Sequence, residues 1–272
     1  MSEPARSRQA RDLAEASLVR IVRGYGTVPE FVLIGGLVPD LLCSRSDQLH
    51  VGTTDIDVQV DLEIANSSAN ARRLEEALRG AGFTADAERG WRWQDRTAPG
   101  LVVRAEFLSD LDDVANHTAV TFDECQDLGA LNLRGTGFAA RDWGLRRLST
   151  DIDGVTANVA LRVAALAGYL LAKTHAAYGR QATKDWYDIA YVVLHNDLGG
   201  PTAAGQRVAE RFGAELAGLV ALWATGLHDG PELPNHDELL RELAEVPTRC
   251  AAAHPPGRAD RRHRGSSRRP DE

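Results

Sequence analysis

Two short stretches decide the fold: residues 31–36 read FVLIGG and residues 53–60 read TTDIDVQV. The first stretch is an all-apolar run that ends in two glycines, which is typical of a strand buried on both faces. The second alternates polar and apolar residues with a period of two, which indicates a half-buried strand. Side chains two positions apart on a strand point to the same face, so we expect Asp55 and Asp57 to project together.

The pattern of predicted secondary structure changes near the middle of the chain. Up to about residue 150, helix and strand patterns alternate, with helices predicted over 10–22, 37–43 and 69–79 and strands over 101–108, after 83 and within 128–138. From residue 158 the apolar spacing predicts helices over 159–178, 184–195, 204–225 and 236–244, and the apolar run 159–172 is predicted to be a buried helix. We expect an α/β (α+β) fold with an N-terminal unit over residues 1–150 and a helical C-terminal unit over residues 151–252.

The composition is that of a globular chain with an uneven charge distribution. The 272 residues carry a net charge of −8, and 43% of them are hydrophobic, which is enough for a sizeable core. Residues 253–272 are rich in arginine and lack large apolar side chains, which predicts a disordered basic tail. A uniformly basic nucleic-acid-binding surface is excluded, so a polyanionic substrate would need a local cationic patch or a metal ion.

Targeting and metal-binding motifs are absent from the sequence. The N-terminal residues contain no apolar signal core, and no apolar run reaches the roughly 20 residues of a membrane span. The cysteines number three and lie far apart, and neither a CxxC nor an HExxH spacing occurs. This argues against a disulfide framework and against a structural zinc site. We therefore expect a cytoplasmic protein with no membrane partner.

Asp55 and Asp57 are the first candidate catalytic residues. On a strand their Cα atoms would lie about 7 Å apart, within reach of one or two hard cations such as Mg²⁺ or Mn²⁺. Gly35 and Gly36 would let a phosphate approach the backbone, where any Cβ would intrude. A glycine turn beside paired carboxylates is the equipment of phosphoryl or nucleotidyl transfer. The alternative is that both aspartates are solvated residues of an edge strand.

Glu106 is the candidate for a third carboxylate, because it lies inside the predicted strand over residues 101–108. On a strand next to the two aspartates it would act as a metal ligand or as a general base. The alternative is a solvent-exposed strand face that Glu106 shares with Arg104.

A second constellation runs from Lys173 to Asp188 and reads KTHAAYGRQATKDWYD. Lys173 and Arg180 fall on one face of a helix, and Asp185 and Asp188 share a face of the next. Both lysines of the chain, Lys173 and Lys184, lie in this window, although the chain has 31 basic residues. Lysine is a compact point charge that suits a phosphate group, whereas arginine is a planar fork. The alternative is an internal ion-pair cluster of Lys184 and Arg180 with the two aspartates.

Together these segments resemble the AbiEii-type nucleotidyltransferases, a branch of the DNA polymerase β-like superfamily that includes the MenT-like toxins. The N-terminal match is IGG at 34–36 with TDIDV at 54–58, and the C-terminal match is K-x2-A-x3-R-x3-K-D-x2-D, which begins at Lys173. The resemblance spans roughly residues 31–192. It implies a polymerase β-like core with a small mixed sheet, followed by a helical C-terminal domain.

The resemblance also implies roles for individual residues. Asp55 and Asp57 would hold the catalytic Mg²⁺, with Glu106 as a third ligand at a position where the family more often has an aspartate. Lys173 would contact the triphosphate, and Asp185 would be a further active-site acid. The residues that would bind the nucleotide are Gly35, Gly36, Thr54, Lys173, Arg180 and Lys184.

The expected function is the Mg²⁺-dependent transfer of a nucleoside monophosphate from an NTP substrate to an acceptor. By resemblance, the chain would be the toxin of a toxin–antitoxin pair, with tRNA as acceptor and a cognate antitoxin as partner. Two alternatives stay open: a small-molecule, antibiotic-type nucleotidyltransferase and a non-catalytic nucleotide-binding module. The acidic body of the chain favours a cationic small acceptor, whereas the arginine-rich tail favours RNA.

Overall fold

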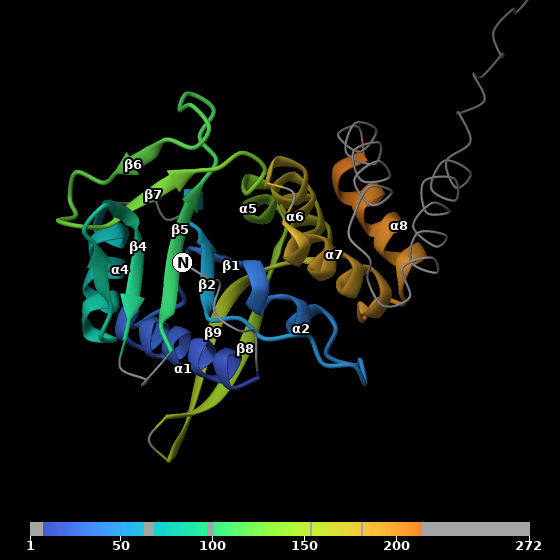
Figure 1. Cartoon of the computed structure of the whole chain (residues 1–272), viewed down its shortest axis with the longest axis horizontal. Helices are drawn as coiled ribbons and strands as arrows, with labels where there is room; N and C mark the ends of the chain where they lie inside the picture. Colours follow the sequence, from blue (N-terminus) through green and yellow to red (C-terminus); the bar gives the residue numbers. More distant parts are fainter. Residues whose placement is uncertain (1–7, 63–67, 97–100, 153, 181, 214–272) are drawn as a thin grey trace, which may run out of the picture.

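The computed structural model describes residues 8–62, 68–96, 101–152, 154–180 and 182–213. These residues form one mixed sheet flanked by helices (Figure 1), which confirms the predicted α+β class. The strands are β1 (Val32–Ile34), β2 (Asp55–Gln59), β3 (Thr84–Asp86), β4 (Arg89–Asp95), β5 (Val103–Ser109), β6 (Ala119–Thr121), β7 (Gly129–Asn132), β8 (Trp143–Ile152) and β9 (Val155–Ala164). Their order across the sheet is β3-β4-β5-β2-β1-β9-β8, and the β6–β7 pair joins the sheet beside β5.

The two decisive stretches form the centre of this sheet. Strand β1 is buried along its whole length and pairs antiparallel with β2. In β2 the apolar side chains of Ile56 and Val58 are buried, whereas Asp55 and Asp57 keep partial exposure. The predicted period of two is therefore confirmed over residues 55–58, whereas Gln59 is buried as well. Strand β5 pairs in parallel along the other edge of β2.

The two glycines shape the turn after β1. Gly35, with a φ of +76°, opens the 3-10 turn η1 (Gly35–Leu37), and helix α2 (Pro39–Leu42) follows. A Cβ at Gly35 would overlap the Asp57 carboxylate, and one at Gly36 would press against the side chain of Thr53. Glycine is therefore needed here so that the turn and the carboxylate strand can approach closely.

The helices form two groups around the sheet. Helices α1 (Arg8–Tyr25) and α4 (Ser68–Gly80) pack on each other, and α1 also contacts β5, β8 and β9. The second group lies to the right of the sheet in Figure 1 and comprises α5 (Gly137–Arg141), α6 (Leu166–Arg180), α7 (Thr183–His195) and α8 (Pro201–Phe212). One continuous hydrophobic core joins the sheet to both groups.

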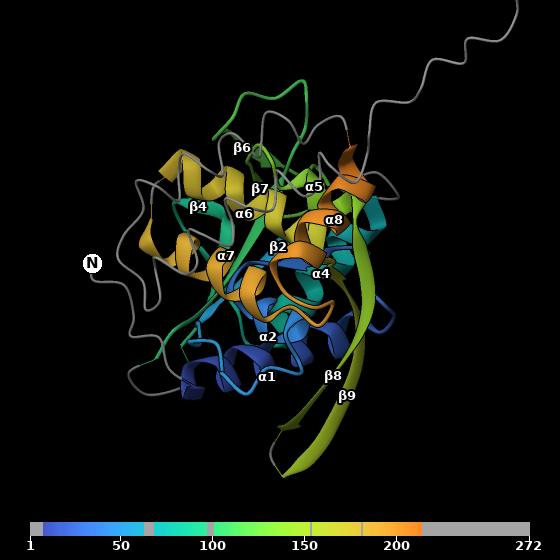
Figure 2. The same ribbon diagram turned by 90° about the vertical axis from the view of Figure 1, so that its right-hand side faces the viewer.

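The predicted buried helix over residues 159–172 is wrong in its first part. Residues up to Ala164 belong to strand β9, and helix α6 begins only at Leu166. β9 forms a long hairpin with β8, which extends beyond α1 (Figure 2), and it also pairs in parallel with β1. A short apolar run fits a buried strand as well as a buried helix, and pairing with β1 decides between them. The predicted unit boundary at residue 150 falls within β8, so the sheet draws on both predicted units.

The other element predictions agree with the structure as far as it describes them. The helices predicted over 10–22, 37–43, 69–79 and 184–195 are present, and the one over 204–225 is described as α8 up to Phe212. The predicted helix over 236–244 and the tail over 253–272 lie outside the described residues. None of the described helices combines the length and the apolar character that crossing a membrane requires.

Candidate active site

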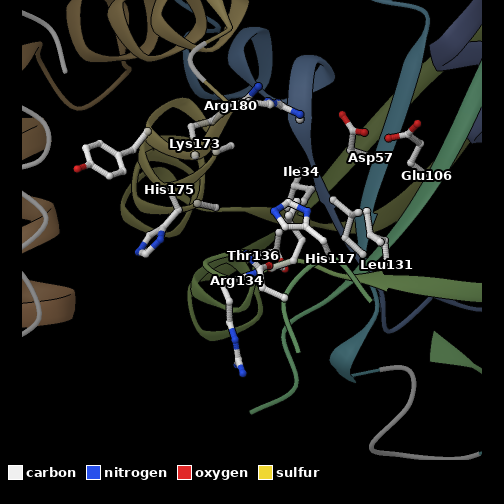
Figure 3. A pocket seen from close by; sticks show the side chains of 18 of the residues that line it. Ile34, Asp57, Glu106, His117, Leu131, Arg134, Thr136, Lys173, His175 and Arg180 are labelled. Atoms are coloured by element: carbon white, nitrogen blue, oxygen red, sulfur yellow. Dashed lines mark hydrogen bonds between the residues drawn. The ribbon is translucent and has the colours of Figure 1, made fainter. Parts of the chain in front are cut away.

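The parallel register of β2 and β5 brings the predicted carboxylates together. Asp57 lies opposite Glu106, and Asp55 lies opposite Arg104. Figure 3 shows the side chains of Asp57 and Glu106 next to each other, with Lys173 and Arg180 on the facing side of the cavity. The structure therefore places the third predicted carboxylate on the strand adjacent to the first two.

The crowding of carboxylates changes the acidity of Asp57. Loss of hydration is the main reason that its pKa rises to about 7, and repulsion from Glu106 and Asp55 adds to it. The positive charges of Lys173 and Arg180 act in the opposite direction but are the smaller influence. A cation held between the carboxylates would relieve this repulsion.

Two arginines that the sequence analysis did not assign to the site lie beside these carboxylates. Arg92 pairs with Glu106 across the β4–β5 ladder, with Nη2 2.5 Å from Oε1. Arg104 Nη1 lies 3.7 Å from Asp55 Oδ1. The side chains of Glu106 and Arg104 are 25% and 20% exposed, so they are not members of a fully solvated strand face.

The second constellation forms a buried ion-pair cluster between α6 and α7. Lys173 Nζ donates hydrogen bonds to Asp185 Oδ1 at 3.0 Å and to Asp188 Oδ2 at 2.7 Å. Arg180 donates two more to Asp185, from Nε at 2.6 Å and from Nη2 at 2.7 Å. The predicted alternative of an ion-pair cluster is thus present, with Lys173 rather than Lys184 at its centre.

The charges of this cluster stabilise each other. Burial acts to raise the pKa of Asp185, but the hydrogen bonds and charges of Arg180 and Lys173 lower it below its ordinary value. Burial likewise acts against the ammonium of Lys173, yet Asp188 and Asp185 raise its pKa above the ordinary value. Lys173 is therefore a permanent cation at neutral pH, held at a fixed place by two carboxylates.

Two adjoining cavities share Asp57, Glu106, Lys173 and Arg180 in their walls. The smaller one has a volume of about 240 Å³ and, apart from Gly36, only polar or charged lining residues. The larger one, of about 390 Å³, adds apolar and aromatic walls from β7 and α6 (Figure 3). The arrangement joins a charged chamber to a chamber that suits an organic ring.

The remaining predicted residues are distributed around these chambers. Gly35 lines the larger cavity, and Gly36 and Lys184 line the smaller one. Thr54 and Asp185 are buried and belong to the wall of neither cavity. Asp185 accepts hydrogen bonds from Lys173 and Arg180, so it positions two residues that line the cavities.

Two histidines of the larger cavity were not predicted. His117 has a φ of +63°, which makes it the one non-glycine residue in the described part of the chain with a positive φ. His175 lies on α6, and its burial lowers its pKa, so its imidazole is neutral at pH 7. No sequence spacing relates a loop histidine to a helix histidine, and the fold alone brings them to one cavity (Figure 3).

Asp55 and Asp57 would suit a Mg²⁺ ion that keeps water or substrate ligands. They would suit less well a metal ion that needs all its ligands from the protein. Within the described ranges, no three His, Cys, Asp or Glu side chains are grouped so that they could hold a metal ion by themselves. Mg²⁺ usually takes one or two carboxylates and completes its shell with water and substrate phosphates. Asp55 and Asp57 would supply such hard oxygen ligands, and burial, with added repulsion from Glu106 and Asp55, raises the pKa of Asp57. Glu106 would first have to exchange Arg92 for the metal.

The chain was compared with family models, curated proteins and solved structures. No family model, curated protein or solved structure matches the chain. The resemblance noted from its motifs is thus a hypothesis, and the residues of the two cavities carry the functional inference.

Proposed function

We propose that the chain is a Mg²⁺-dependent nucleotidyltransferase of the polymerase β-like type. The observation that supports this most is the wall shared by the two cavities, where Asp57 and Glu106 face Lys173 and Arg180. A nucleoside triphosphate needs cations and metal-binding carboxylates for its phosphates and a less polar space for its base and sugar. The charged and the larger cavity offer these two environments side by side.

Each group of residues has a separate task in this reaction. An acceptor hydroxyl attacks the α-phosphorus, a new P–O bond forms, and pyrophosphate leaves with the electrons of the broken bond. Lys173, held by its two aspartates, neutralises the charge that develops on the phosphates. Asp55 and Asp57 would hold Mg²⁺, which supplies Lewis-acid stabilisation of the phosphoryl oxygens. Glu106, which lies opposite Asp57, would accept the proton of the attacking hydroxyl.

A labelling assay tests the reaction directly. The protein is incubated with Mg²⁺ and each of the four NTPs, labelled at the α- or the γ-phosphate, together with total tRNA, protein or small-molecule acceptors. Transfer of the α-label but not of the γ-label identifies nucleotidyl transfer and separates it from kinase activity. A folded protein that binds NTP but transfers no label to any acceptor would instead be a non-catalytic nucleotide-binding module.

For the acceptor we propose tRNA, and with it the role of a toxin neutralised by a cognate antitoxin. This proposal rests on the motif resemblance and on the arginine-rich residues 255–272. The excess of acidic over basic residues outside this segment favours the alternative, a cationic small-molecule acceptor. Deleting residues 255–272 distinguishes the two: an enzyme that holds RNA with these arginines loses affinity and part of its salt dependence. Unchanged affinity and salt dependence would remove the tail from the proposal.

A further inference from the structure

His50 has no task in the proposed reaction, yet it contacts the residues that hold Lys173. It lies in the segment between α2 and β2, shortly before Asp55. Its imidazole is completely buried and packs against the rings of Tyr187 and Tyr191, at centroid distances of 5.1 and 5.0 Å. Its Nε2 is 2.9 Å from Asp188 Oδ1.

The chemistry of the two groups fixes which of them donates in this hydrogen bond. A carboxylate oxygen only accepts, so His50 Nε2 carries the proton. The buried Nδ1 has no hydrogen-bond partner among the described residues, and a second proton there would be an unsatisfied donor. In this hydrogen bond His50 is therefore the donor and Asp188 the acceptor. Because the other oxygen of Asp188 accepts from Lys173, the Asp188 carboxylate is held on both sides.

The segment that carries His50 is fastened to α7 at two more points. The backbone N–H of Val51 donates to the Tyr187 hydroxyl at 3.3 Å, and the Tyr191 hydroxyl donates to the Gln48 carbonyl at 2.6 Å. The same segment leads directly into β2, where Asp55 and Asp57 line the charged cavity. These contacts connect the helix that supports Lys173 with the strand that carries the carboxylates.

We propose that His50 is a positioning residue that holds Lys173 at its working distance from Asp55 and Asp57. The catalytic consequence rests on the proposed nucleotidyltransferase function. Without the bond to His50, Asp188 gains freedom, and the Lys173 ammonium loses its fixed place against the triphosphate. Small misplacements of this kind cost up to about 100-fold in catalytic efficiency.

Two substitutions separate the hydrogen bond from the packing. His50→Phe keeps an aromatic ring against the two tyrosines but removes the donor, whereas His50→Gln keeps an N–H donor and loses the ring. We expect the phenylalanine variant to raise the KM for NTP about 10- to 100-fold and to leave the KM for the acceptor unchanged. The glutamine variant should restore the KM for NTP to near wild type. Equal defects in both variants would overturn the proposal, because ring packing alone would then explain them.

A second measurement reads Lys173 without any catalysis. Because the chain has only Lys173 and Lys184, lysine labelled with ¹³C and ¹⁵N gives two sets of side-chain NMR signals, and Lys184→Arg assigns them. We expect His50→Phe to shift the Lys173 signals and to accelerate hydrogen exchange of its ammonium, and His50→Gln to do neither. If the phenylalanine variant does not fold, His50→Met fills a similar volume without a donor. Unchanged Lys173 signals in the donor-free variant overturn the proposal, whereas shifted signals in a protein without nucleotidyl transfer contradict only the proposed function.

Discussion

The carboxylates of β2 and β5 and the aspartates of α7 show two opposite outcomes of burying acidic groups. Asp57 lies beside other carboxylates, and its pKa rises to about 7. Asp185 is completely buried, but it accepts hydrogen bonds from Lys173 and Arg180, and its pKa falls. Burial alone raises the pKa of both groups, so their neighbours decide the outcome.

The two clusters should therefore contribute differently to stability. The α7 cluster contains two acids and two bases, so it is electrically complete and stabilises the packing of α6 on α7. In the strand cluster Arg92 pairs with Glu106 and Arg104 lies beside Asp55, but Asp57 is still repelled by both neighbouring carboxylates. Removing one charge should therefore have opposite effects on stability in the two clusters. The predictions that follow test this contrast, beginning with the largest expected effect.

Asp57→Asn should abolish turnover and stabilise the metal-free protein. Loss of a group that binds Mg²⁺ in the transition state is expected to lower kcat/KM by about 1000-fold or more. At pH 8 the substitution also removes a repelled carboxylate, so Tm in EDTA should rise by about 3 °C, the shift that ~1 kcal/mol produces in a chain of this size. Label transfer and thermal unfolding measure the two effects, with the exposed Asp113→Asn as control. Lost activity accompanied by a lower Tm would place Asp57 in the folding core instead.

Asp185→Asn should act on stability in the opposite direction. The substitution removes the buried counter-charge of Arg180 and leaves Lys173 with Asp188 alone. Breaking a buried ion pair in this way costs about 3–5 kcal/mol. Urea unfolding compared with that of Asp57→Asn measures the contrast. An Asp185→Asn variant as stable as wild type would show that the ion pairs of Asp185 do not stabilise the folded protein.

Lys173→Arg and Lys184→Arg test whether the cation must be a point charge. Arginine keeps the charge of Lys173 but not its geometry between two aspartates, so we expect kcat/KM to fall about 10- to 100-fold, as for a lost charged hydrogen bond. Lys184 is partly exposed on the rim of the charged cavity, so its substitution should change kcat/KM about threefold at most. Similar losses in both variants would show that the charge, rather than the buried geometry, matters at this wall.

The smallest effect is the pH dependence of the metal-free protein. The folded pKa of Asp57, about 7, exceeds its ordinary value, so the folded state keeps a proton that the unfolded chain releases above about pH 4. The contribution of Asp57 to stability is therefore lost as the pH rises from 4 to 7. For Asp185 the folded pKa is lowered, so its contribution is present above pH 4 and lost on acidification.

Unfolding free energies of wild type and Asp57→Asn at pH 5 and pH 8 measure this slope. The free energy of unfolding at pH 5 should exceed that at pH 8 by a larger amount in wild type than in the variant. Mg²⁺ at tenfold its dissociation constant should raise the free energy of unfolding of wild type by about 1.4 kcal/mol at pH 8. The same Mg²⁺ concentration should raise that of the variant only slightly. A variant with the same slope and the same response to Mg²⁺ would contradict the assignment of Asp57.

The sequence predicted the parts of this site that depend on local periodicity. Alternation in residues 53–60 placed Asp55 and Asp57 on one face of a strand, and helical spacing brought Lys173 and Arg180 to one face of a helix. The two lysines of the chain, which the sequence analysis singled out, both line the charged cavity. These features needed no partner segment, because the period of a strand or helix is a property of the backbone itself.

Only the tertiary structure decided which segments become neighbours. Residues 159–164, predicted as the start of a helix, belong to strand β9; Glu106 pairs with Arg92, and His50 contacts Asp188. Register, burial and the charges around a carboxylate all arise from segments far apart in the chain. The sequence by itself determined which residues could do the chemistry, whereas long-range pairing determined which of them are held by counter-charges and which repel.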